Sequence, residues 1–339
     1  MEINTLGTYR NFVKNALQDG GAIKPLIVPA NLTKGTGLMN PSIINDNGIL
    51  RVVIRHVNYT FYHSENKLFL HPWGPLTYLH PENDQHLRTD NYYGELNNST
   101  DLRLDGVKKI DMSFGDTYEP KWDFVGLEDA RIVRWDGKLY ITGVRRDTTT
   151  NGQGRMELSE ITVTPDSVKE ISRFRIPTPL DPNAYCEKNW MPIVDKPYHY
   201  IKWCTPTEIV KVDPETQTCQ RVALTDNPAI RRDLRGGTQA IKIGNHYVAI
   251  THEVDLFKSD VGRKDAVYHH RWVMWDENWN IVKYSKEFFF LDAQVEFAIG
   301  MCIVENDNVL ITFGFQDNAA YVLRCPISTI MQFIEENSK

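Results

Sequence analysis

The sequence predicts an all-β fold, a β-propeller with a short helix near each end. Most of the 339 residues form short apolar strands separated by polar turns such as Trp-Asp-Gly-Lys and Glu-Asn-Asp-Asn. In addition, the strands recur in five groups of similar pattern. Regular repetition of small sheets is typical of radial architectures. A β-sandwich with additional strands is the alternative that the pattern leaves open.

Helical spacing of apolar residues occurs at both ends of the chain. Ahead of the Gly-Gly pair at 20–21, which gives a stop signal, apolar side chains recur at helical intervals at Leu6, Tyr9, Phe12, Val13 and Leu17. A second, shorter helix is expected from Ser328. No linker divides the chain, so we expect a single domain over 1–339 with an N-terminal extension at 1–30.

Each of the five groups contains three expected strands. They are expected at 48–55, 59–63 and 67–70; at 130–135, 138–144 and 156–163; at 189–194, 199–204 and 208–212; at 237–243, 246–252 and 269–275; and at 298–304, 309–315 and 320–325. Residues 76–119 are polar, weakly periodic and too many for an ordinary turn. We expect them to form a long functional loop or an additional hairpin near the site.

The composition narrows the class of protein. The formal net charge is −6 with both signs mixed, which gives no basic footprint for nucleic acid or an anionic membrane. No apolar stretch approaches the roughly 18 residues of a membrane span, and the first residues lack the apolar core of a signal peptide. The five cysteines have no CxxC spacing and fit a reduced compartment. These features predict a cytoplasmic protein, whose oligomeric state, a homo-oligomer included, they leave open.

The densest group of charged residues is Gly-Leu-Glu-Asp-Ala-Arg at 126–131, directly before an apolar strand. Adjacent side chains of a strand face opposite ways, so Glu128 and Asp129 cannot both face one site. The carboxylate that faces away braces the backbone or pairs with Arg131. A carboxylic acid that serves as a general acid needs a raised pKa, which burial or a nearby negative charge supplies. Taken alone, such a pair is also what a surface turn with a local ion pair contains.

Other chemistries find little support. The sequence has no P-loop, dinucleotide fingerprint, GxSxG elbow or HExxH motif. The adjacent His269 and His270 would point to opposite sides of a strand, so we expect no metal site there. The tryptophans are expected in the blade cores, with Trp190 alone kept as a wall of the site.

Five motifs, in order along the chain, resemble those of glycoside hydrolase family 130, which comprises β-mannoside phosphorylases and related mannosidases. They also resemble those of the β-1,2-mannosyltransferases that share its propeller. The motifs are Asn-Pro-Ser-Ile (40–43) with a strand ending at Arg55; Gly-Leu-Glu-Asp-Ala-Arg (126–131); Glu-Lys-Asn-Trp-Met-Pro (187–192); Arg-Gly-Gly-Thr-Gln (235–239) with Thr-His-Glu (251–253); and Phe-Gly-Phe-Gln-Asp-Asn (313–318). The resemblance covers most of the chain and implies a five-bladed β-propeller.

The sequence departs from the family pattern in two places. Ala130 stands where proline is commoner in the family. The fifth blade begins with Val-Glu-Phe-Ala-Ile-Gly-Met (295–301), which differs from the family's usual sequence there. The role of Glu296 is therefore open between a sugar ligand, a base in a hydrolase and a structural group.

The resemblance also implies roles for individual residues. Asp129 would be the general acid. The substrate-binding set would be Asn40, Ser42, Arg55, Glu128, Lys188, Asn189 and Asp317. The phosphate-binding set would be Arg145, Arg146, His252 and Tyr268, with Lys188 and Asn189 as further candidates. Strand alternation indicates that only one of Arg145 and Arg146 faces the site, and the sequence does not say which.

These expectations lead to a function. Phosphate can attack a glycosidic carbon without a protein base, provided that cationic side chains hold it in line. We therefore expect an inverting, reversible β-mannoside phosphorylase that yields mannose 1-phosphate, with inorganic phosphate as co-substrate and no cofactor. The alternatives are a β-1,2-mannosyltransferase, an inverting β-mannosidase with a second carboxylate, and a non-catalytic propeller that binds glycans or a protein.

Overall fold

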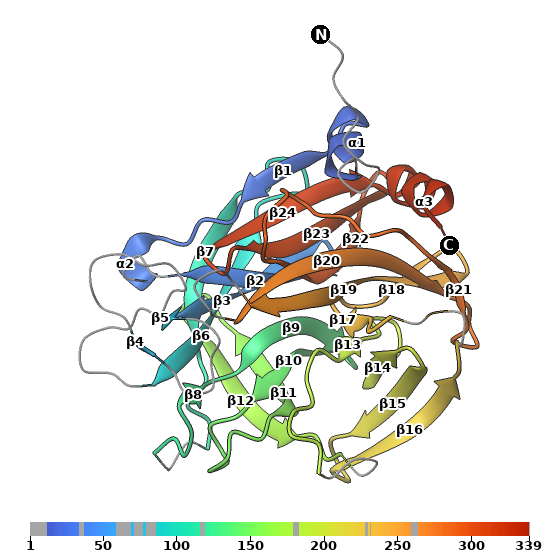
Figure 1. The fold of residues 1–339 in the computed structure, drawn as a ribbon. Coiled ribbons are helices and arrows are strands. Elements are labelled where there is room, and N and C mark those ends of the chain that lie inside the picture. The colour runs from blue at the N-terminus through green and yellow to red at the C-terminus, as the bar shows by residue number, and fades with distance from the viewer. Residues whose placement is uncertain are drawn as a thin grey trace.

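The computed structural model describes residues 12–33, 37–58, 69–70, 77–78, 86–115, 119–178, 183–227, 230, 232–258 and 264–338 (Figure 1). Most of the regular structure in them is strand, and the strands form successive sheets around a common centre. The protein is therefore a five-bladed β-propeller, as predicted. No helix in the described part of the chain is long and apolar enough to cross a membrane.

Each blade runs from an innermost strand at the centre to an outer strand at the rim. The first blade contains β2 (Leu38–Asp46), β3 (Ile49–Val57), β6 (Leu87–Leu96) and β7 (Leu104–Asp111); the second contains β9 (Glu128–Trp135), β10 (Lys138–Arg145), β11 (Arg155–Val163) and β12 (Val168–Arg175). The third contains β13 (Met191–Pro192), β14 (His199–Cys204), β15 (Thr207–Asp213) and β16 (Thr218–Thr225). The fourth contains β17 (Arg235–Gly236), β18 (Ile241–Ile243), β19 (His246–Lys258), β20 (Lys264–Trp275) and β21 (Ile281–Tyr284); the fifth contains β22 (Glu296–Val304), β23 (Asn308–Phe315), β24 (Ala319–Pro326) and β1 (Ala22–Pro25).

The first blade differs from the prediction. Its outer half is the hairpin of β6 and β7, which lies within the segment expected to be a loop or an additional hairpin, 76–119. The expected strand at 67–70 is not part of the blade, because its last two residues form β4 (Phe69–Leu70) and pair with β5 (Thr77–Tyr78). Residues 59–63 lie outside the described residues. The β6 strand was missed because two of its buried side chains, Thr89 and Asn91, are polar and hide the apolar alternation.

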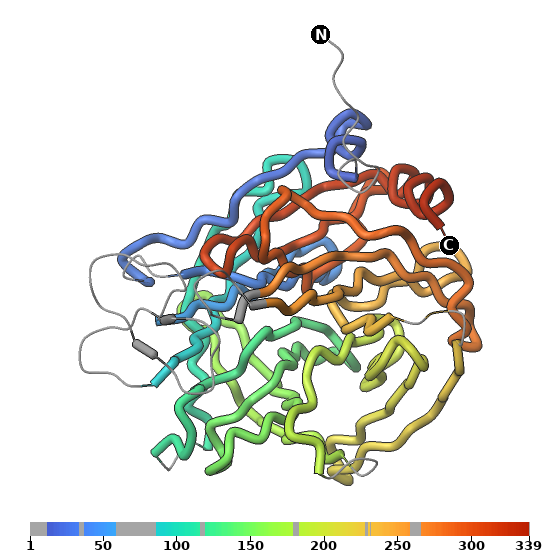
Figure 2. The backbone as a smooth tube through the Cα atoms, viewed as in Figure 1, coloured from blue at the N-terminus to red at the C-terminus, as the bar shows by residue number. Residues whose placement is uncertain are grey.

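The N-terminal segment closes the ring. The β1 strand pairs antiparallel with β24, so the outermost strand of the last blade comes from the start of the chain. Figure 2 shows this N-terminal segment running alongside the C-terminal strands. The predicted N-terminal extension thus contributes a strand to the fifth blade.

The first and second blades also meet at their rims. A short parallel pairing joins β7 to β12 there. Next to this junction, the two-residue strand β8 (Phe124–Val125) pairs parallel with β6.

Short helices lie at the ends of the chain, as expected. The α1 helix (Phe12–Gln18) packs on α3 (Ile327–Glu336), and the Phe12 and Phe333 rings are 5.2 Å apart. A third short helix, α2 (Ala30–Thr33), precedes β2. Leu6 and Tyr9 of the expected first helix lie outside the described residues.

One glutamine holds the inner strands together. Gln239 is fully buried, and its Nε2 donates to Ser42 Oγ and to the carbonyls of Ile43 and Ile132 at 2.9–3.2 Å. Its Oε1 accepts from the Met301 N–H at 3.0 Å. This side chain from the fourth blade therefore bonds to the first, second and fifth blades at once.

Candidate active site

The centre of the candidate site is the carboxylate of Asp129, at the start of the innermost strand of the second blade. Its Oδ1 accepts hydrogen bonds from Asn40 Nδ2 at 2.8 Å and from Arg55 Nη1 at 2.9 Å. Both donors come from the first blade. Arg55 is held in turn by Thr89 Oγ1, which accepts from its Nε at 3.2 Å. Two neighbouring strands of the first blade, β2 and β3, thus converge on one carboxylate oxygen of the second blade.

Backbone conformation marks four of the predicted residues. Asn40, Asp129, Asn189 and Asp317 all have positive φ, between 48° and 62°. The pairing register of β2 shifts beside Asn40, and that of β9 and β10 shifts beside Asp129. Strained backbone and bulges gather where a fold re-aims side chains into a site. Asn and Asp are also the residues that adopt this conformation most readily after glycine.

Several buried polar atoms in this region have no hydrogen-bond partner in the described structure. They are Asn40 Oδ1, Arg131 Nη2, Asn189 Oδ1 and His252 Nδ1. A buried polar atom without a partner needs an explanation. Four of them, with both donors and acceptors, fit a site that binds a ligand rich in hydroxyl groups.

The pKa values of the two aspartates of the site are shifted in opposite directions. Burial on its own raises the pKa of Asp129, but the charge of Arg55 and the hydrogen bond from Asn40 outweigh it, so the pKa lies below its usual value. The enclosed position of Asp317 raises its pKa to about 6; Arg55 opposes this shift and the charge of Asp129 adds to it. Asp129 is therefore ionised, contrary to the raised pKa expected of a general acid.

Glu128 and Arg146 form an ion pair next to Arg55. The Glu128 carboxylate lies 3.5 Å from Arg146 Nε and 4.0 Å from Arg55 Nη2. Arg146 also donates to Cys186 Sγ at 3.1 Å. Arg146 is thus the arginine of the pair that faces the site.

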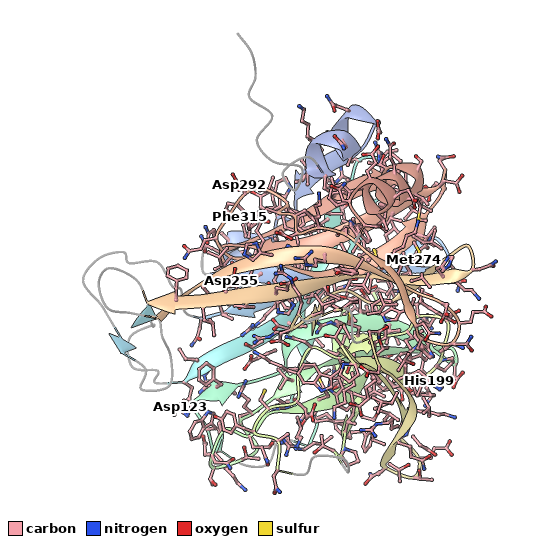
Figure 3. The ribbon with its side chains drawn as sticks, turned by 45° about the vertical axis from the view of Figure 1, so that its right-hand side comes forward. Asp123, His199, Asp255, Met274, Asp292 and Phe315 are labelled. Atoms are coloured by element: carbon pink, nitrogen blue, oxygen red, sulfur yellow. The ribbon has the colours of Figure 1, made fainter. Side chains whose placement is uncertain are left out.

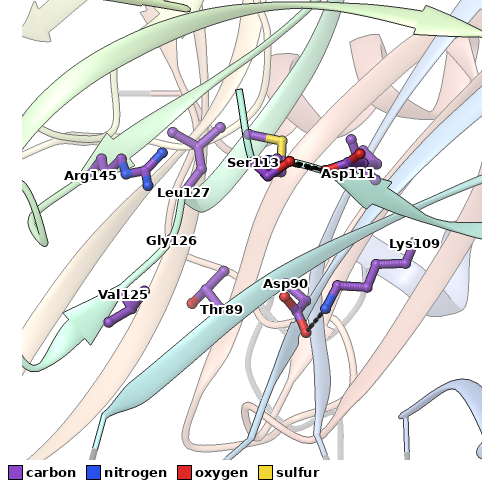
Figure 4. Close-up of a pocket in the computed structure, with 11 residues that line it drawn as sticks. Thr89, Asp90, Lys109, Asp111, Ser113, Val125, Gly126, Leu127 and Arg145 are labelled. Atoms are coloured by element: carbon purple, nitrogen blue, oxygen red, sulfur yellow. Dashed lines mark hydrogen bonds and ion pairs between the residues drawn. The ribbon is translucent and has the colours of Figure 1, made fainter. Parts of the chain in front are cut away.

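Arg145 points the other way. Its guanidinium donates twice to Asp147, at 2.8 and 3.2 Å, and both side chains are buried. It lines a separate cavity of about 450 Å³ between the first and second blades, together with Thr89 and Leu127 (Figure 4). The prediction that Arg145 binds phosphate is therefore not supported by where the structure places it.

The third and fourth blades supply the remaining predicted groups. Lys188 is exposed, makes no hydrogen bond or ion pair with any described residue, and is close enough to Asp129 to lower its pKa. His252 stacks on Tyr268 at 5.6 Å with the rings nearly parallel. Burial, with a contribution from His270, holds the pKa of His252 well below its usual value, so the ring is neutral. It can exchange a hydrogen bond with a ligand but adds no positive charge.

Three predicted residues have structural positions. Ser42 is fully buried and its hydroxyl accepts from the Ile132 N–H as well as from Gln239, so it joins blades and does not face a ligand. Trp190 was expected to form a wall of the site, but it is buried in the third blade and donates to Glu187. Glu296 accepts the N–H groups of Phe290, Leu291 and Ala293 at 2.6–3.1 Å, which gives it the structural role.

Sequence reasoning missed Thr89 and Cys186, and it gave Arg131 a different contact. Arg131 donates to the backbone carbonyl of Asp129 at 3.0 Å and to that of Gly237 at 2.8 Å, so it braces the strained turn and not a carboxylate. Cys186 directly precedes the Glu-Lys-Asn-Trp motif, and this position in the sequence could have identified it as a residue near the site. Among the described residues, no group of three His, Cys, Asp or Glu side chains is arranged to hold a metal ion.

Comparison with known proteins adds to this picture at the level of the fold. No family model matches the sequence, and no curated protein matches it. The structure is similar to that of a β-1,2-mannobiose phosphorylase from Listeria innocua in complex with β-1,2-mannobiose, with a TM-score of 0.57, 16% identity, and 93% of this chain and 97% of that chain covered.

Two further solved structures match over 86% of this chain and 85% of their own. One was reported with the finding that the GH130 family of mannoside phosphorylases contains glycoside hydrolases that target β-1,2 mannosidic linkages in Candida mannan; its TM-score is 0.58 at 14% identity. The other is a glycosyl hydrolase from Bacteroides ovatus, with a TM-score of 0.54 at 13% identity. The chain therefore has the five-bladed propeller fold of glycoside hydrolase family 130, as its motifs predict.

Proposed function

We propose that the protein is an inverting phosphorylase of β-mannosides that yields mannose 1-phosphate. The observation that carries the proposal is the position of Asp129, on which Asn40 and Arg55 converge in the middle of the propeller. Lys188 is close enough to lower the pKa of Asp129, and Arg146 pairs with the adjacent Glu128. Mannose as the sugar is supported by the family resemblance and by the mannobiose bound to the Listeria innocua protein.

The reaction exchanges one bond at the anomeric carbon. A phosphate oxygen attacks that carbon from the face opposite the leaving group, and the bond to the glycosidic oxygen breaks. Asp129 gives its proton to the departing oxygen, and the product is mannose 1-phosphate of inverted configuration. Phosphate is itself the nucleophile, so no protein base is needed. Arg146 and Lys188 would hold it in line and offset its desolvation.

The lowered pKa of Asp129 is compatible with this role. The carboxylate is held ionised chiefly by Arg55 and Asn40, with Lys188 among the weaker contributors. A phosphate dianion beside the carboxylate would neutralise the cations and add a negative charge, and a bound sugar would exclude water. Each of these changes raises the pKa of a carboxyl group. Asp129 would therefore take up its proton when the substrates bind.

A hydrolase is the second candidate, and Asp317 is the observation that favours it. An inverting hydrolase needs a second carboxylate that activates water. The pKa of Asp317 is raised to about 6 and responds to the charge of Asp129. A base with such a pKa suits reaction near neutral pH. In the phosphorylase, Asp317 would bind the sugar instead.

The test is product analysis on a panel of β-linked mannosides, with and without inorganic phosphate. Mannose 1-phosphate that forms only with phosphate, and is lost in Asp129→Asn, is the expected result. Asp136→Asn is the matched control, because Asp136 lies in the same blade, also has positive φ (49°), and is exposed. Free mannose without phosphate would establish the hydrolase. Binding of mannosides without turnover in either condition would leave the mannosyltransferase, tested with activated mannose donors, or a glycan-binding propeller.

A further inference from the structure

The first two blades form one continuous sheet that almost closes on itself. The pairing of β7 with β12 joins their rims, so the strand order runs β2, β3, β6, β7, β12, β11, β10 and β9. The two ends of this sheet meet at the centre of the propeller, where the Ile132 N–H of β9 donates to Ser42 Oγ of β2 at 3.1 Å. Eight strands arranged in this way enclose an interior like that of a small β-barrel.

A cavity opens at one end of this interior. Apolar side chains of both blades form the core inside the sheet, among them Val53, Ile132 and Ile141. The cavity of about 450 Å³ lies where the strands end, because its lining comes from the start of β6, the end of β7, residues 125–127 before β9 and the last residue of β10. The mouths of β-barrels are common places for small-molecule sites, whose volumes are roughly 300–1,000 Å³.

The lining of the cavity combines an apolar wall with groups that exchange hydrogen bonds. Val125 and Leu127, on the approach to β9, lie across the space from Lys109 and Asp111 of β7 (Figure 4). The Asp111 carboxylate accepts from Ser113 Oγ at 2.6 Å, and both side chains belong to the lining. An apolar wall that faces a few polar groups suits a molecule with one apolar face and several hydroxyl groups.

The charges of the lining cancel. It contains two carboxylates, Asp90 and Asp111, and two cations, Lys109 and Arg145. The Asp90 carboxylate lies 2.8 Å from Lys109 Nζ, and Arg145 donates to the buried Asp147. Carboxylate oxygens can accept from hydroxyl groups, and an ammonium group can donate to them. A charged ligand, in contrast, would lose its hydration without meeting an excess of opposite charge. The cavity therefore favours an uncharged ligand.

The cavity adjoins the candidate active site, although neither Asn40 nor Asp129 lines it. Thr89 does line it, and the Thr89 hydroxyl accepts from Arg55 Nε at 3.2 Å. Gly126, with a φ of 97°, packs so closely on β6 that a Cβ there would lie 2.2 Å from the Thr89 carbonyl oxygen. The wall between cavity and site thus consists of the residue that holds Arg55 and of the turn that leads to Asp129.

We propose that this cavity binds one uncharged monosaccharide, as a second sugar site beside the candidate active site. A pyranose ring has an apolar face of C–H groups, which suits Val125 and Leu127. It also has an edge of hydroxyl groups, which suits Lys109 and the two carboxylates. A sugar held here would contact Thr89, whose hydroxyl bonds to Arg55. The inference goes beyond the proposed function, since it requires no chemistry at Asp129.

Calorimetry with D-mannose as the probe tests the site on the whole chain. We expect one molecule to bind in the cavity with a Kd of about 1–10 mM, because a ligand of this size has few atoms that can contribute. Val125→Trp and Ser113→Trp would fill the cavity from two sides, and each should weaken this binding about tenfold or more. Val222→Trp is the matched control, because Val222 is 49% exposed on the third blade. Cyclohexanol, a ring of the same size with a single hydroxyl group, should bind about tenfold more weakly than mannose.

Mannose 1-phosphate distinguishes the two sites. It should occupy the candidate active site if the proposed function holds, and its negative charge disfavours the cavity. The mannose binding that Val125→Trp removes should therefore persist when mannose 1-phosphate is present. Failure of mannose 1-phosphate to bind would count against the proposed function and leave the cavity site standing.

Several results would overturn the cavity site. Wild-type protein that binds no mannose, or mannose affinity that is equal in the wild type and both tryptophan variants, would do so. Displacement of mannose by mannose 1-phosphate would place the sugar in the candidate active site instead. Equal affinity for cyclohexanol and mannose would contradict a sugar site. If a tryptophan variant does not fold, as its thermal midpoint would show, Lys109→Met replaces it, because the Lys109 side chain is 55% exposed. This change should weaken mannose binding about three- to tenfold, and an unchanged affinity would refute the site.

Discussion

Replacing Asp317 with asparagine should make the protein more stable at neutral pH. The pKa of Asp317 is raised to about 6 in the folded protein, from an ordinary value of 3.8. A carboxyl group with a raised pKa holds its proton more tightly in the folded state than in the unfolded state. Its contribution favours folding below the unfolded pKa and is lost as the pH rises through the folded value. At neutral pH the ionised Asp317 therefore destabilises the fold.

The magnitude follows from the size of the shift. A difference of roughly two pKa units corresponds to about 3 kcal/mol above pH 6, at 1.36 kcal/mol per unit. Asp317 is partly accessible to solvent, which screens its interactions, so we expect a gain of about 1–3 kcal/mol for Asp317→Asn at pH 8. The gain should shrink between pH 6 and pH 4 as the wild-type carboxyl group takes up its proton.

Thermal unfolding of wild type and variant at pH 4, 6 and 8 would measure this. Asp307→Asn is the matched control, since Asp307 lies in the same blade, has a φ of 53° and is exposed. It should leave the midpoint nearly unchanged at every pH. A lower midpoint for Asp317→Asn at pH 8, or a gain that does not vary with pH, would show that charge at this position does not oppose folding. The electrostatic account of the site would then be wrong.

Four other predictions address the ring of blades, the anion site and the protonation of Asp129. Gln239→Ala should lower the unfolding free energy by about 3–5 kcal/mol, because four hydrogen bonds to three blades are lost, as a shift in the thermal midpoint would show. Arg146→Met should raise the KM for phosphate about ten- to hundredfold while the thermal midpoint stays close to wild type. Arg145→Met should leave the KM for phosphate unchanged but lower the unfolding free energy by about 3–5 kcal/mol, because Asp147 would be left buried without its partner. An unchanged thermal midpoint would contradict the structural role of Arg145. Phosphate binding with sugar present should take up a proton that Asp129→Asn does not take up, seen as a binding enthalpy that varies with the ionisation enthalpy of the buffer; equal uptake by the two proteins would argue against protonation of Asp129 on binding.

Much of the fold could be predicted from the sequence, because the inner strands of the second, third and fifth blades are strongly apolar. The expected strands at 130–135, 138–144 and 309–315 coincide closely with β9, β10 and β23. The strands of the first blade were harder to predict. Its β6 strand buries Thr89 and Asn91 because they hold Arg55 and the Leu127 carbonyl, and residues chosen for such contacts interrupt the apolar period.

The site could be predicted in part for a similar reason. Motif residues such as Asn40, Arg55 and Asp129 do converge, since each has a polar partner in another blade. The sequence could not separate residues that face the pocket from those that support it. Ser42 belongs to the same motif as Asn40, yet the bulge in β2 turns it into the packed centre. Nor could the sequence show that Trp203 is 45% exposed while Trp190 is buried, because exposure depends on which neighbouring blade covers each ring.

The long β19–β20 hairpin shows the same limit at the outer surface. It continues well past the end of its blade, and Asp255 lies on this outlying part (Figure 3). Leu256 and Phe257 are exposed there, at 53% and 44%. The sequence predicted only the inner part of each strand, because the outlying Asp255–Phe257 are exposed and place two apolar side chains next to each other, without the regular alternation of a core strand.

The way the ring closes has a consequence for how the protein is made. The strand that completes the fifth blade, β1, leaves the ribosome first, and its partner β24 is translated about 300 residues later, which takes roughly 15–60 seconds at 5–20 residues per second. During that interval β1 has no edge to join, and afterwards β24 has an open edge until β1 arrives. An unpaired edge of this kind recruits strands from other molecules. Docking of β1 is therefore the step that covers this edge, and it can take place only after the last blade has been made.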